Sequence, residues 1–274
     1  MTIQVDHETA KAFQKRVMRW WKENARDLPW RIDPSPYTVL VSEVMLQQTQ
    51  VNRVVPKFLE FLDAFPTVKD LANAETKRLL QVWSGLGYNR RALWLRDAAI
   101  QIVEQGEFPK TTENLEKLKG IGPYTSRSIL IFAFNQDLAA VDTNIRRVLI
   151  ANGFAEETMT ESQIQDVADQ LLMKGRSRDW HNALMDFGAL VQTARSTGIP
   201  PASAQPKFTG SARQIRGAII RIISCIDSIG DIDLASKLEA EGIRLVETDM
   251  IIDQLIGEGF LERTKDGELK IAEC

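Results

Sequence analysis

Two acidic residues stand in surroundings that could change how they bind a proton. Glu43 lies in "YTVLVSEVMLQQTQV", a stretch with helical spacing. Its neighbours on the same helix face are Val39, Leu40, Leu46 and Gln47. A carboxylate on so apolar a face is either paired with an arginine, for which Arg31 is a candidate, or has a raised pKa. A raised pKa would suit a proton donor that works near neutral pH.

The second acid, Asp142, follows the apolar stretch "LAAV" and stands at the start of an expected helix, "TNIRRVL". An aspartate in this position commonly caps the helix by accepting hydrogen bonds from backbone N–H groups. An aspartate in this position could instead be a catalytic residue. The sequence here leaves both roles open.

A third feature is the segment "LKGIGPYT" (118–125), which joins two expected helices. Gly120 and Gly122 would allow a sharp turn, because glycine adopts positive φ freely. Backbone N–H groups at the start of the next helix could then bind a phosphate oxygen, and the carbonyls of Leu118 and Gly120 could hold a monovalent cation. The pattern is typical of the helix-hairpin-helix that binds DNA without sequence specificity. It also fits a plain corner between two helices.

These residues must be positioned by helices, since helical spacing dominates the sequence before residue 260. One amphipathic helix is expected over 8–25, with Phe13, Val17, Trp20 and Trp21 on one face. Others are expected over 38–55, 56–64, 68–73, 75–83 and 88–105, on both sides of the hairpin, and in the stretch up to 193. The Pro- and Ser-rich stretch 194–210 is typical of a linker.

The remaining residues, 211–274, predict three helices followed by two short strands around a Lys-Asp-Gly turn, the pattern of a winged helix. The expected fold is therefore mainly α, with a helical domain over 1–193 and a small C-terminal domain. The third of these helices, "VETDMIIDQLIGEG", is acidic, so insertion into a major groove would be unfavourable. We expect it to pack on the helical domain or to bind a protein.

Composition is that of an ordinary globular protein, with 44% hydrophobic and 26% charged residues. No apolar run approaches the ~18 residues of a membrane helix and the start is unlike a signal peptide, so we expect a cytoplasmic protein. The net charge of -3 argues against a protein that coats nucleic acid indiscriminately. Basic clusters occur in "NRRALWLR" (89–96), "NIRRV" (144–148) and "KGRSR" (174–178). They suit contacts with a few phosphates, or are solvated helix faces.

The chain has two cysteines, Cys225 and Cys274. Neither has a second thiol or a histidine at metal-ligand spacing, so the sequence predicts no iron–sulfur cluster, no zinc site and no other cofactor.

Ordered blocks over residues 10–193 resemble the helix-hairpin-helix (HhH-GPD) DNA glycosylases, and specifically their MutY-like, adenine-specific branch. The blocks are "LPWR" (28–31), "SEVMLQQTQV" (42–51), "FPTVKDLANA" (65–74), "GLGY" (85–88), "LKGIGPYT" (118–125), "VDTNIRRVL" (141–149) and "MDFGAL" (185–190). The resemblance implies a two-lobed fold. One lobe would be a helical barrel over about 27–133, and the other would combine 1–26 with 134–193.

The resemblance also implies roles for single residues. Glu43, Asp142 and Tyr124 match catalytic positions, and Asp186 matches a residue at the edge of the flipped adenine. The positions that match DNA contacts are Gln48, Tyr88, Leu86, Gly120, Gly122, Thr125 and Arg31. Of these, Gln48 and Tyr88 would fill the gap left by the flipped base and touch the opposite guanine.

Some relatives have a lysine at the position of Tyr124, which forms a Schiff base and cuts the DNA backbone. A phenol cannot do so, and we expect a monofunctional enzyme. Most relatives of the adenine branch also carry four cysteines after "GAL" and a C-terminal Nudix-like domain that recognises 8-oxoguanine. Here Gln192 stands at the first cysteine position, and the winged helix replaces the Nudix-like domain.

The leading hypothesis is a monofunctional base excision repair glycosylase that removes adenine opposite 8-oxoguanine or guanine. A thymine or uracil mismatch glycosylase and an inactive DNA-binding protein are the alternatives. The expected partner is double-stranded DNA with a mismatch or an oxidised base, bound by a monomer, and the acidic C-terminal domain is a candidate site for a protein partner.

Overall fold

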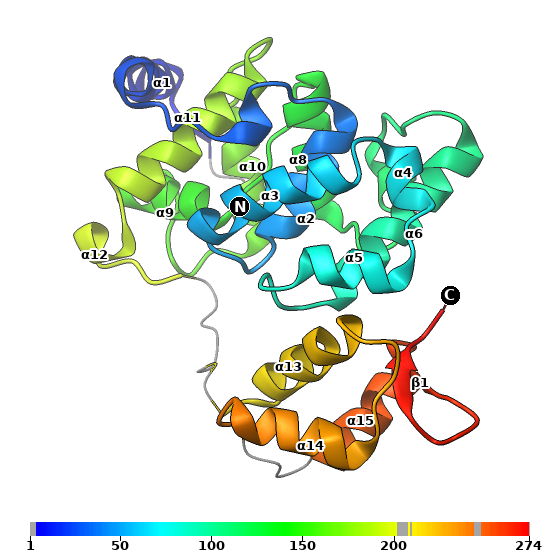
Figure 1. Cartoon of the computed structure of the whole chain (residues 1–274). Coiled ribbons are helices and arrows are strands. Elements are labelled where there is room, and N and C mark those ends of the chain that lie inside the picture. The colour runs from blue at the N-terminus through cyan, green and yellow to red at the C-terminus, as the bar shows by residue number, and fades with distance from the viewer. Residues whose placement is uncertain (1–3, 202–207, 209, 244–247, 274) are drawn as a thin grey trace. The chain divides into compact units, whose positions relative to one another are not determined.

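Helices dominate the computed structural model, which describes residues 4–201, 208, 210–243 and 248–273 (Figure 1). Among these residues the strands are β1 (Leu261–Arg263) and β2 (Leu269–Ile271), which pair antiparallel with Leu261 opposite Ile271. They flank the predicted Lys-Asp-Gly turn, in which Gly267 has a φ of 82°. The prediction of a mainly α fold is confirmed. Within the described ranges, no helix is both long and apolar enough to span a membrane.

The chain forms two compact units, made of residues 1–43 with 109–204 and of residues 44–108 with 205–274. The helices of the first unit are α1 (His7–Asn24), the 3-10 helix η1 (Pro29–Arg31), α7 (Thr112–Leu115), α8 (Pro123–Phe134), α9 (Thr143–Ala151), α10 (Glu161–Gln170), α11 (Ser177–Leu190) and α12 (Ala194–Thr197). Those of the second are α3 (Val51–Ala64), α4 (Val68–Ala72), α5 (Thr76–Trp83), α6 (Arg90–Gln105), α13 (Ala212–Ser224), α14 (Asp231–Ala240) and α15 (Thr248–Gly257). Helix α2 (Pro36–Leu46) begins in the first unit and ends in the second.

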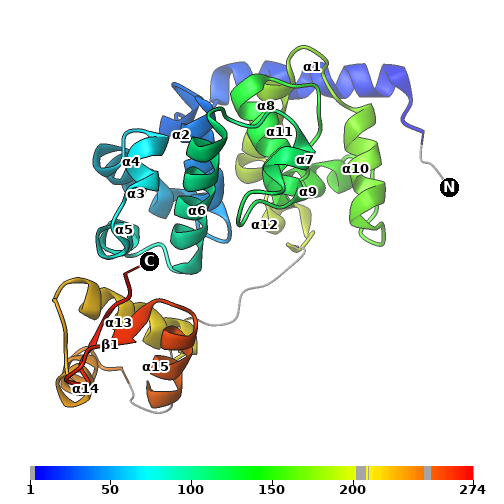
Figure 2. The ribbon, with the colours of Figure 1, turned by 90° about the vertical axis from the view of Figure 1, so that its right-hand side faces the viewer.

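In the second unit, residues after the linker pack with residues 44–108. The predicted domain bounds stay a prediction. We call residues 211–273 the C-terminal segment. Its α13 packs against α5, and also against α14, α15 and β2 within the segment (Figure 2). The helices and the hairpin follow in the predicted order.

The core of the first unit forms around α1, α9 and α11. The predicted apolar face of α1 is confirmed, since Phe13 and Val17 are buried and Trp20 and Trp21 are partly buried. The Phe13 ring lies 4.9 Å from that of Phe154 and 5.7 Å from that of Trp180. Because α9 and α11 share this core, the start of α9 is held in place by packing on the helices beside it.

The predicted helices 38–55 and 56–64 are wrong in one respect. The helix breaks at residues 47–50, and α3 then continues through Pro56, where the sequence predicted a break. Pro56 lies in the second turn of α3, so its missing N–H removes one intrahelical hydrogen bond without ending the helix. The actual break places Gln48 in a loop with a φ of 56°.

Candidate active site

Glu43 is buried in α2, with 9% of its surface exposed. Its neighbours Val39 and Leu40 are buried as well, as the apolar face predicted. Burial raises the pKa of Glu43 to about 7, the nearby Ser128 hydroxyl lowers it, and the charge of Asp142 raises it further. Of the two explanations offered by the sequence, the raised pKa is the one the structure supports. The guanidinium of Arg31 is bound elsewhere.

Asp142 is the N-cap of α9, and one carboxylate oxygen accepts a 2.7 Å hydrogen bond from the backbone N–H of Ile145. The other accepts a 2.9 Å bond from the side-chain amide of Asn144. Burial raises the pKa of Asp142, and these donors together with the charge of Arg147 act in the opposite direction. The cap predicted from the sequence therefore exists, and the charge of Asp142 also acts on Glu43. The catalytic role stays a prediction.

Tyr124 lies in the first turn of α8, beside both acids. Burial raises the pKa of its phenol well above the ordinary value, and the charges of Glu43 and Asp142 raise it further. The buried Ser128 hydroxyl, one turn along α8, acts on both Tyr124 and Glu43. The structure thus brings the three predicted catalytic residues into one electrostatic group, in which burial raises the pKa of the phenol and of both acids.

Close packing of α9 against α11 supports this group. A Cβ atom added to Gly188 of α11 would lie 2.8 Å from both the Cβ and the backbone oxygen of Asn144. Arg147 of α9 donates to the carbonyl of Gly188 at 3.2 Å and to the side chain of Asn144 at 3.2 Å. Asn144 in turn holds Asp142. The roles of Ser128, Asn144, Arg147 and Gly188 were not predicted from the sequence, although the glycine in "MDFGAL" was a signal for a close helix approach.

The segment before Asp142 is held by His181 of α11. The ring Nε2 accepts a 3.1 Å hydrogen bond from the backbone N–H of Ala140, and Nδ1 lies 2.7 Å from the carbonyl oxygen of Ser177. These two contacts indicate a neutral ring protonated on Nδ1. Burial lowers the pKa of His181 to about 4, so this support stays neutral at physiological pH.

The hairpin lies at the predicted position, but only one of its two glycines has the positive φ that the sequence predicted for the turn. Gly120 has a φ of 77°, whereas Gly122 is the extended N-cap of α8 with a φ of -102°. The Leu118 carbonyl accepts a 3.2 Å bond from the N–H of Ile121, which leaves one lone pair for a cation. The Thr125 side chain is buried, so only its backbone could meet a phosphate. The cation site stays a prediction.

Asp186 differs from its predicted role at the edge of the flipped base. Its carboxylate is fully buried and accepts hydrogen bonds from Trp21 (3.0 Å), Arg26 (2.6 Å) and Arg31 (2.8 and 2.9 Å). Burial raises the pKa of Asp186, but the hydrogen bonds and charges of the two arginines outweigh it and lower the pKa overall. Asp186 therefore joins α11 to the segment after α1. Arg31, predicted to contact DNA, is committed to this ion pair.

The second unit contains the other predicted DNA contacts. Gln48 and Tyr88 are exposed and have positive φ values of 56° and 47°, which are unfavourable for residues with a side chain. Leu86, in the same loop as Tyr88, is buried, so its side chain is unsuited to contact DNA in this conformation. Gln48 and Tyr88 lie in two separate loops, 47–50 and 84–89, that follow α2 and α5.

Arg91 of α6 joins these two loops. Its guanidinium is buried and donates to the carbonyls of Val44 (2.8 Å) and Gln47 (2.7 Å) at the end of α2. It also donates to Gly87 (3.0 Å), next to Tyr88. Burial lowers the pKa of Arg91 to about 10, so it keeps its charge at neutral pH. Arg91 therefore supports the two strained loops that present Gln48 and Tyr88.

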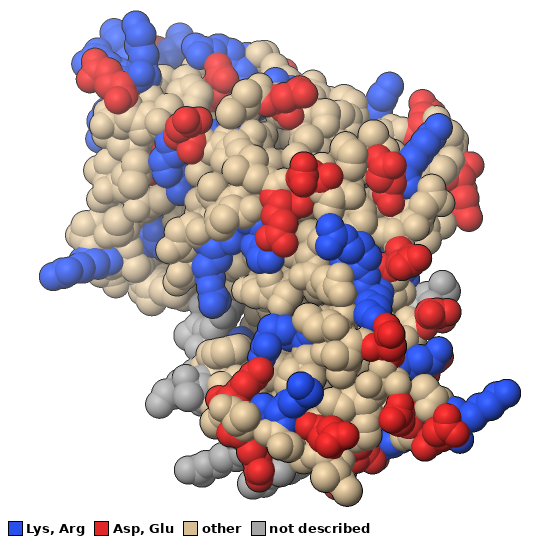
Figure 3. Space-filling view, viewed as in Figure 1, with Lys and Arg blue, Asp and Glu red and all other residues tan. Residues whose placement is uncertain are grey.

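The basic clusters mix buried, paired and exposed side chains, and their phosphate-binding role stays a prediction. In the cluster 89–96, Arg91 and Arg96 are buried and Arg90 pairs with Glu258 at 2.7 Å. Arg147 is buried in the second cluster, and Arg176 pairs with Asp179 at 2.9 Å in the third. Over the C-terminal segment, acidic and basic side chains alternate on the face shown in Figure 3. Helical spacing directs neighbouring arginines of one cluster to different sides of a helix, so only some of them reach the surface.

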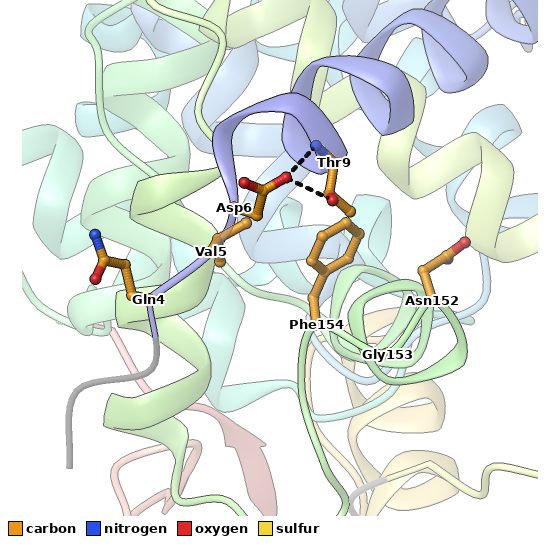
Figure 4. Close-up of a pocket in the computed structure, with 7 residues that line it drawn as sticks. All are labelled: Gln4, Val5, Asp6, Thr9, Asn152, Gly153 and Phe154. Carbon is orange, nitrogen blue, oxygen red and sulfur yellow. Dashed lines mark hydrogen bonds between the residues drawn. The ribbon is translucent and has the colours of Figure 1, made fainter.

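One hollow in the first unit lies at the start of α1 (Figure 4). It is lined by Gln4, Val5, Asp6, Thr9, Asn152, Gly153 and Phe154. None of the predicted site residues lines it, and Asp6 serves there as the N-cap of α1. Among the residues that the structure places, no group of three or more His, Cys, Asp or Glu side chains could hold a metal ion.

Comparison with known proteins gives the class. Residues 41–174 match the model of the HhH-GPD superfamily base excision DNA repair protein. The chain is 32% identical over 279 residues to "Adenine DNA glycosylase" of Mycolicibacterium smegmatis, with 93% of this chain and 94% of that protein covered. The chain therefore belongs to the HhH-GPD superfamily of base excision DNA repair proteins. It is a DNA glycosylase.

Other similar proteins agree with this class. The human "Adenine DNA glycosylase" is 38% identical over 197 residues, which cover 66% of this chain and 36% of the human protein. The solved structure of a thermostable thymine-DNA glycosylase matches with a TM-score of 0.65 at 26% identity, covering 69% of this chain and 90% of that one. A trapped endonuclease III–DNA covalent intermediate matches with a TM-score of 0.62 at 19% identity, covering 73% of this chain and 92% of that one, which supports the fold.

Proposed function

We propose that this protein hydrolyses the bond between adenine and deoxyribose where adenine is mispaired with 8-oxoguanine or guanine. The observation that carries the proposal is the raised pKa of Glu43, to about 7, beside Asp142. Adenine is a poor leaving group unless it is protonated, and a donor of this pKa can both hold and release a proton at neutral pH. The names of two similar relatives support adenine as the base.

In the proposed reaction, the Glu43 carboxyl gives its proton to N7 of the flipped adenine. The bond between C1′ and N9 then breaks, its electron pair leaves with the base, and positive charge develops on the sugar. Asp142 faces that charge as a carboxylate, supported by the donors from Ile145 and Asn144. Water adds its oxygen to C1′ and returns a proton to Glu43.

Tyr124 makes the proposed enzyme monofunctional. A neutral phenol near Glu43 and Asp142 can donate a hydrogen bond, but it cannot form the Schiff base that backbone cleavage requires. Borohydride should therefore trap no covalent complex with the wild type and a measurable amount with Tyr124→Lys. Trapping by the wild type would contradict this part of the proposal.

We propose that the enzyme works without an iron–sulfur cluster. Such a cluster is held by four thiolates, and this chain has only Cys225 and Cys274, so the residues do not fit it. Gln192, at the first expected ligand position, instead accepts a 2.9 Å hydrogen bond from the side-chain amide of Asn152. The short helix α12, capped by Thr193, follows directly. We propose that these contacts order the segment that a cluster orders in relatives.

A second candidate is removal of thymine or uracil opposite guanine, which the likeness to a thymine-DNA glycosylase favours. One assay separates the candidates. Labelled duplexes that carry A·8-oxoG, A·G, T·G or U·G are incubated with the protein and then cleaved with alkali at any abasic site. Cleavage at adenine is the expected result. Cleavage only at thymine or uracil would support the second candidate, and binding without cleavage would indicate an inactive protein.

A further inference from the structure

The hydroxyl of Ser128 is buried beside Glu43 and Tyr124, and the reaction proposed above gives it no role. Ser128 lies on α8 one turn after Tyr124, and its exposed fraction is 0%. Residues four apart share one face of a helix, so these two side chains lie on the same face of α8. The Ser128 hydroxyl lowers the pKa of Glu43 and that of Tyr124, which places it near both groups.

Three other buried serines show how a hydroxyl inside a helix is normally bonded. Ser42 and Ser224 donate to the backbone carbonyl three residues earlier in their own helices, at 3.0 and 2.9 Å. Ser126, two residues before Ser128, can donate at 3.0 Å to the carbonyl three residues earlier and at 2.9 Å to the Glu116 carboxylate. Each of these hydroxyl groups therefore has a partner in the fold.

Ser128 differs from these serines. Among the residues that the structure describes, its Oγ has no hydrogen-bond partner at ordinary distance and angle. A buried hydroxyl without a partner destabilises a protein, because it has lost its hydrogen bonds to water and gained none in return. A catalytic role is one reason for a protein to keep such a group. The proximity of Ser128 to Glu43 makes that the explanation to test.

The donor becomes useful at the moment when Glu43 loses its proton. A protonated carboxyl is neutral and gains little from a nearby hydroxyl. A carboxylate accepts a charge-assisted hydrogen bond, which is about twice as strong as a bond between neutral groups. A bond from Ser128 would therefore form as adenine takes the proton, and it would offset part of the penalty that burial places on the Glu43 carboxylate.

We infer that Ser128 is a positioning residue for this proton transfer, whose hydroxyl donates a hydrogen bond to the Glu43 carboxylate that forms when adenine takes the proton. The inference rests on the proposed function, which makes Glu43 the proton donor. Of the described residues, the titratable and charged groups around Glu43 are Asp142 at the start of α9, Tyr124 on α8 and, through its effect on Asp142, Arg147. Ser128→Ala leaves all of them in place.

The test is the pH dependence of single-turnover adenine excision from an A·8-oxoG duplex by the full chain. Ser128→Ala removes the donor, so the midpoint of the alkaline fall in rate should rise by about one pH unit, the shift expected for one charge-assisted hydrogen bond. A weaker acid also releases its proton less readily, which should lower the rate at pH 6 about threefold. The variant should therefore be slower than the wild type at pH 6 and faster at pH 9.

Ser126→Ala is the matched control, because Ser126 is equally buried on the same helix but its hydroxyl is already bonded. This variant should melt at a lower temperature than the wild type and keep the same midpoint. Ser128→Ala should melt no lower than the wild type at pH 6, since the hydroxyl that it removes has no partner. An equal slowing of Ser128→Ala at every pH, or the same midpoint shift in Ser126→Ala, would overturn the inference.

An NMR titration of the Glu43 carboxyl in the free protein separates this inference from the proposed function, because it needs no DNA. Ser128→Ala should raise the midpoint above the wild-type value of about 7. An unchanged midpoint would overturn the inference while leaving the proposed function intact. If the wild type removes adenine from no duplex, the proposed function itself fails, whatever the titration shows.

Discussion

The carboxyl group of Glu43 in the first unit and the guanidinium group of Arg91 in the second are both buried. Burial has different consequences for the charge of the two groups. Burial raises the pKa of Glu43 to about 7, so this acid changes charge in the physiological range. Burial lowers the pKa of Arg91 to about 10, and it stays charged. Every hydrogen-bond partner found for Arg91 within the described ranges is an uncharged oxygen.

The comparison shows how chemistry and recognition differ in what they demand of a buried ionisable group. A proton donor must gain and lose its charge during the reaction, so partial stabilisation of both forms is useful. A residue that supports strained loops must keep its charge, since the carbonyls around it would otherwise lose their donor. Arg91 meets that demand because guanidinium has a high intrinsic pKa.

The largest expected effect comes from Glu43→Gln, which keeps the shape of the side chain and removes its acidic proton. Excision of adenine should fall by about a thousandfold in single-turnover assays, the range for losing a general acid. Glu60→Gln is a suitable control, since Glu60 lies on α3 and pairs with Lys57 at the surface. A loss of less than tenfold for Glu43→Gln would remove Glu43 from the mechanism.

The same variant should change how stability depends on pH. The pKa of Glu43 is raised in the folded state from 4.5 to about 7, so the wild type gains stability below pH 4.5 and loses it as the pH rises through 7. Glutamine does not titrate. The free energy of unfolding of Glu43→Gln, measured relative to that of the wild type, should therefore be about 3 kcal/mol higher at pH 8 than at pH 4. Denaturant unfolding curves of the wild type and the variant at these two pH values measure the difference. They would show no such gain if the pKa of Glu43 had its ordinary value.

Arg91→Met tests the recognition side of the comparison. It should cost about 3 kcal/mol of stability, because it leaves buried carbonyls without a donor. It should also change the preference for the base opposite adenine, because the Gln48 and Tyr88 loops lose their common support. Arg96→Met is matched, since Arg96 is buried on the same helix but donates to Ala74 and Thr76. Denaturation should show a loss for both variants, with altered base preference only for Arg91→Met. The same change of base preference in both variants would mean that any weakening of α6 alters this preference, and Arg91 would then have no special role in it.

Gly188→Ala should have the smallest effect of the three substitutions. Its Cβ would press on Asn144 and shift the start of α9, at a cost of about 1–3 kcal/mol and with slower excision. Gly217→Ala on α13 is the control, because a Cβ there would meet nothing within 4 Å. Helix propensity should make that variant more stable by about 0.5–1 kcal/mol. Thermal unfolding measures the stability change of both variants. Stability changes of the same sign in the two variants would contradict the packing argument.

The sequence predicted much of the catalytic group and little of the recognition support. The apolar face around Glu43 and the helix start at Asp142 are local patterns, and both gave the correct surroundings. The sequence around Arg91 gave no signal for its role, because the carbonyls of Val44 and Gln47 that it binds lie more than 40 residues earlier in the chain. Asp186 and Arg31 were misjudged for the same reason, because their ion pair joins residues 155 positions apart. Resemblance located these residues but could not give their partners.

The carbon NMR titration of the Glu43 side-chain carboxyl tests the central claim most directly. The account predicts a midpoint near pH 7 in the wild type and a lower midpoint in Asp142→Asn, because that substitution removes a negative charge that raises the pKa of Glu43. A midpoint near 4.5 that does not respond to Asp142→Asn would contradict it.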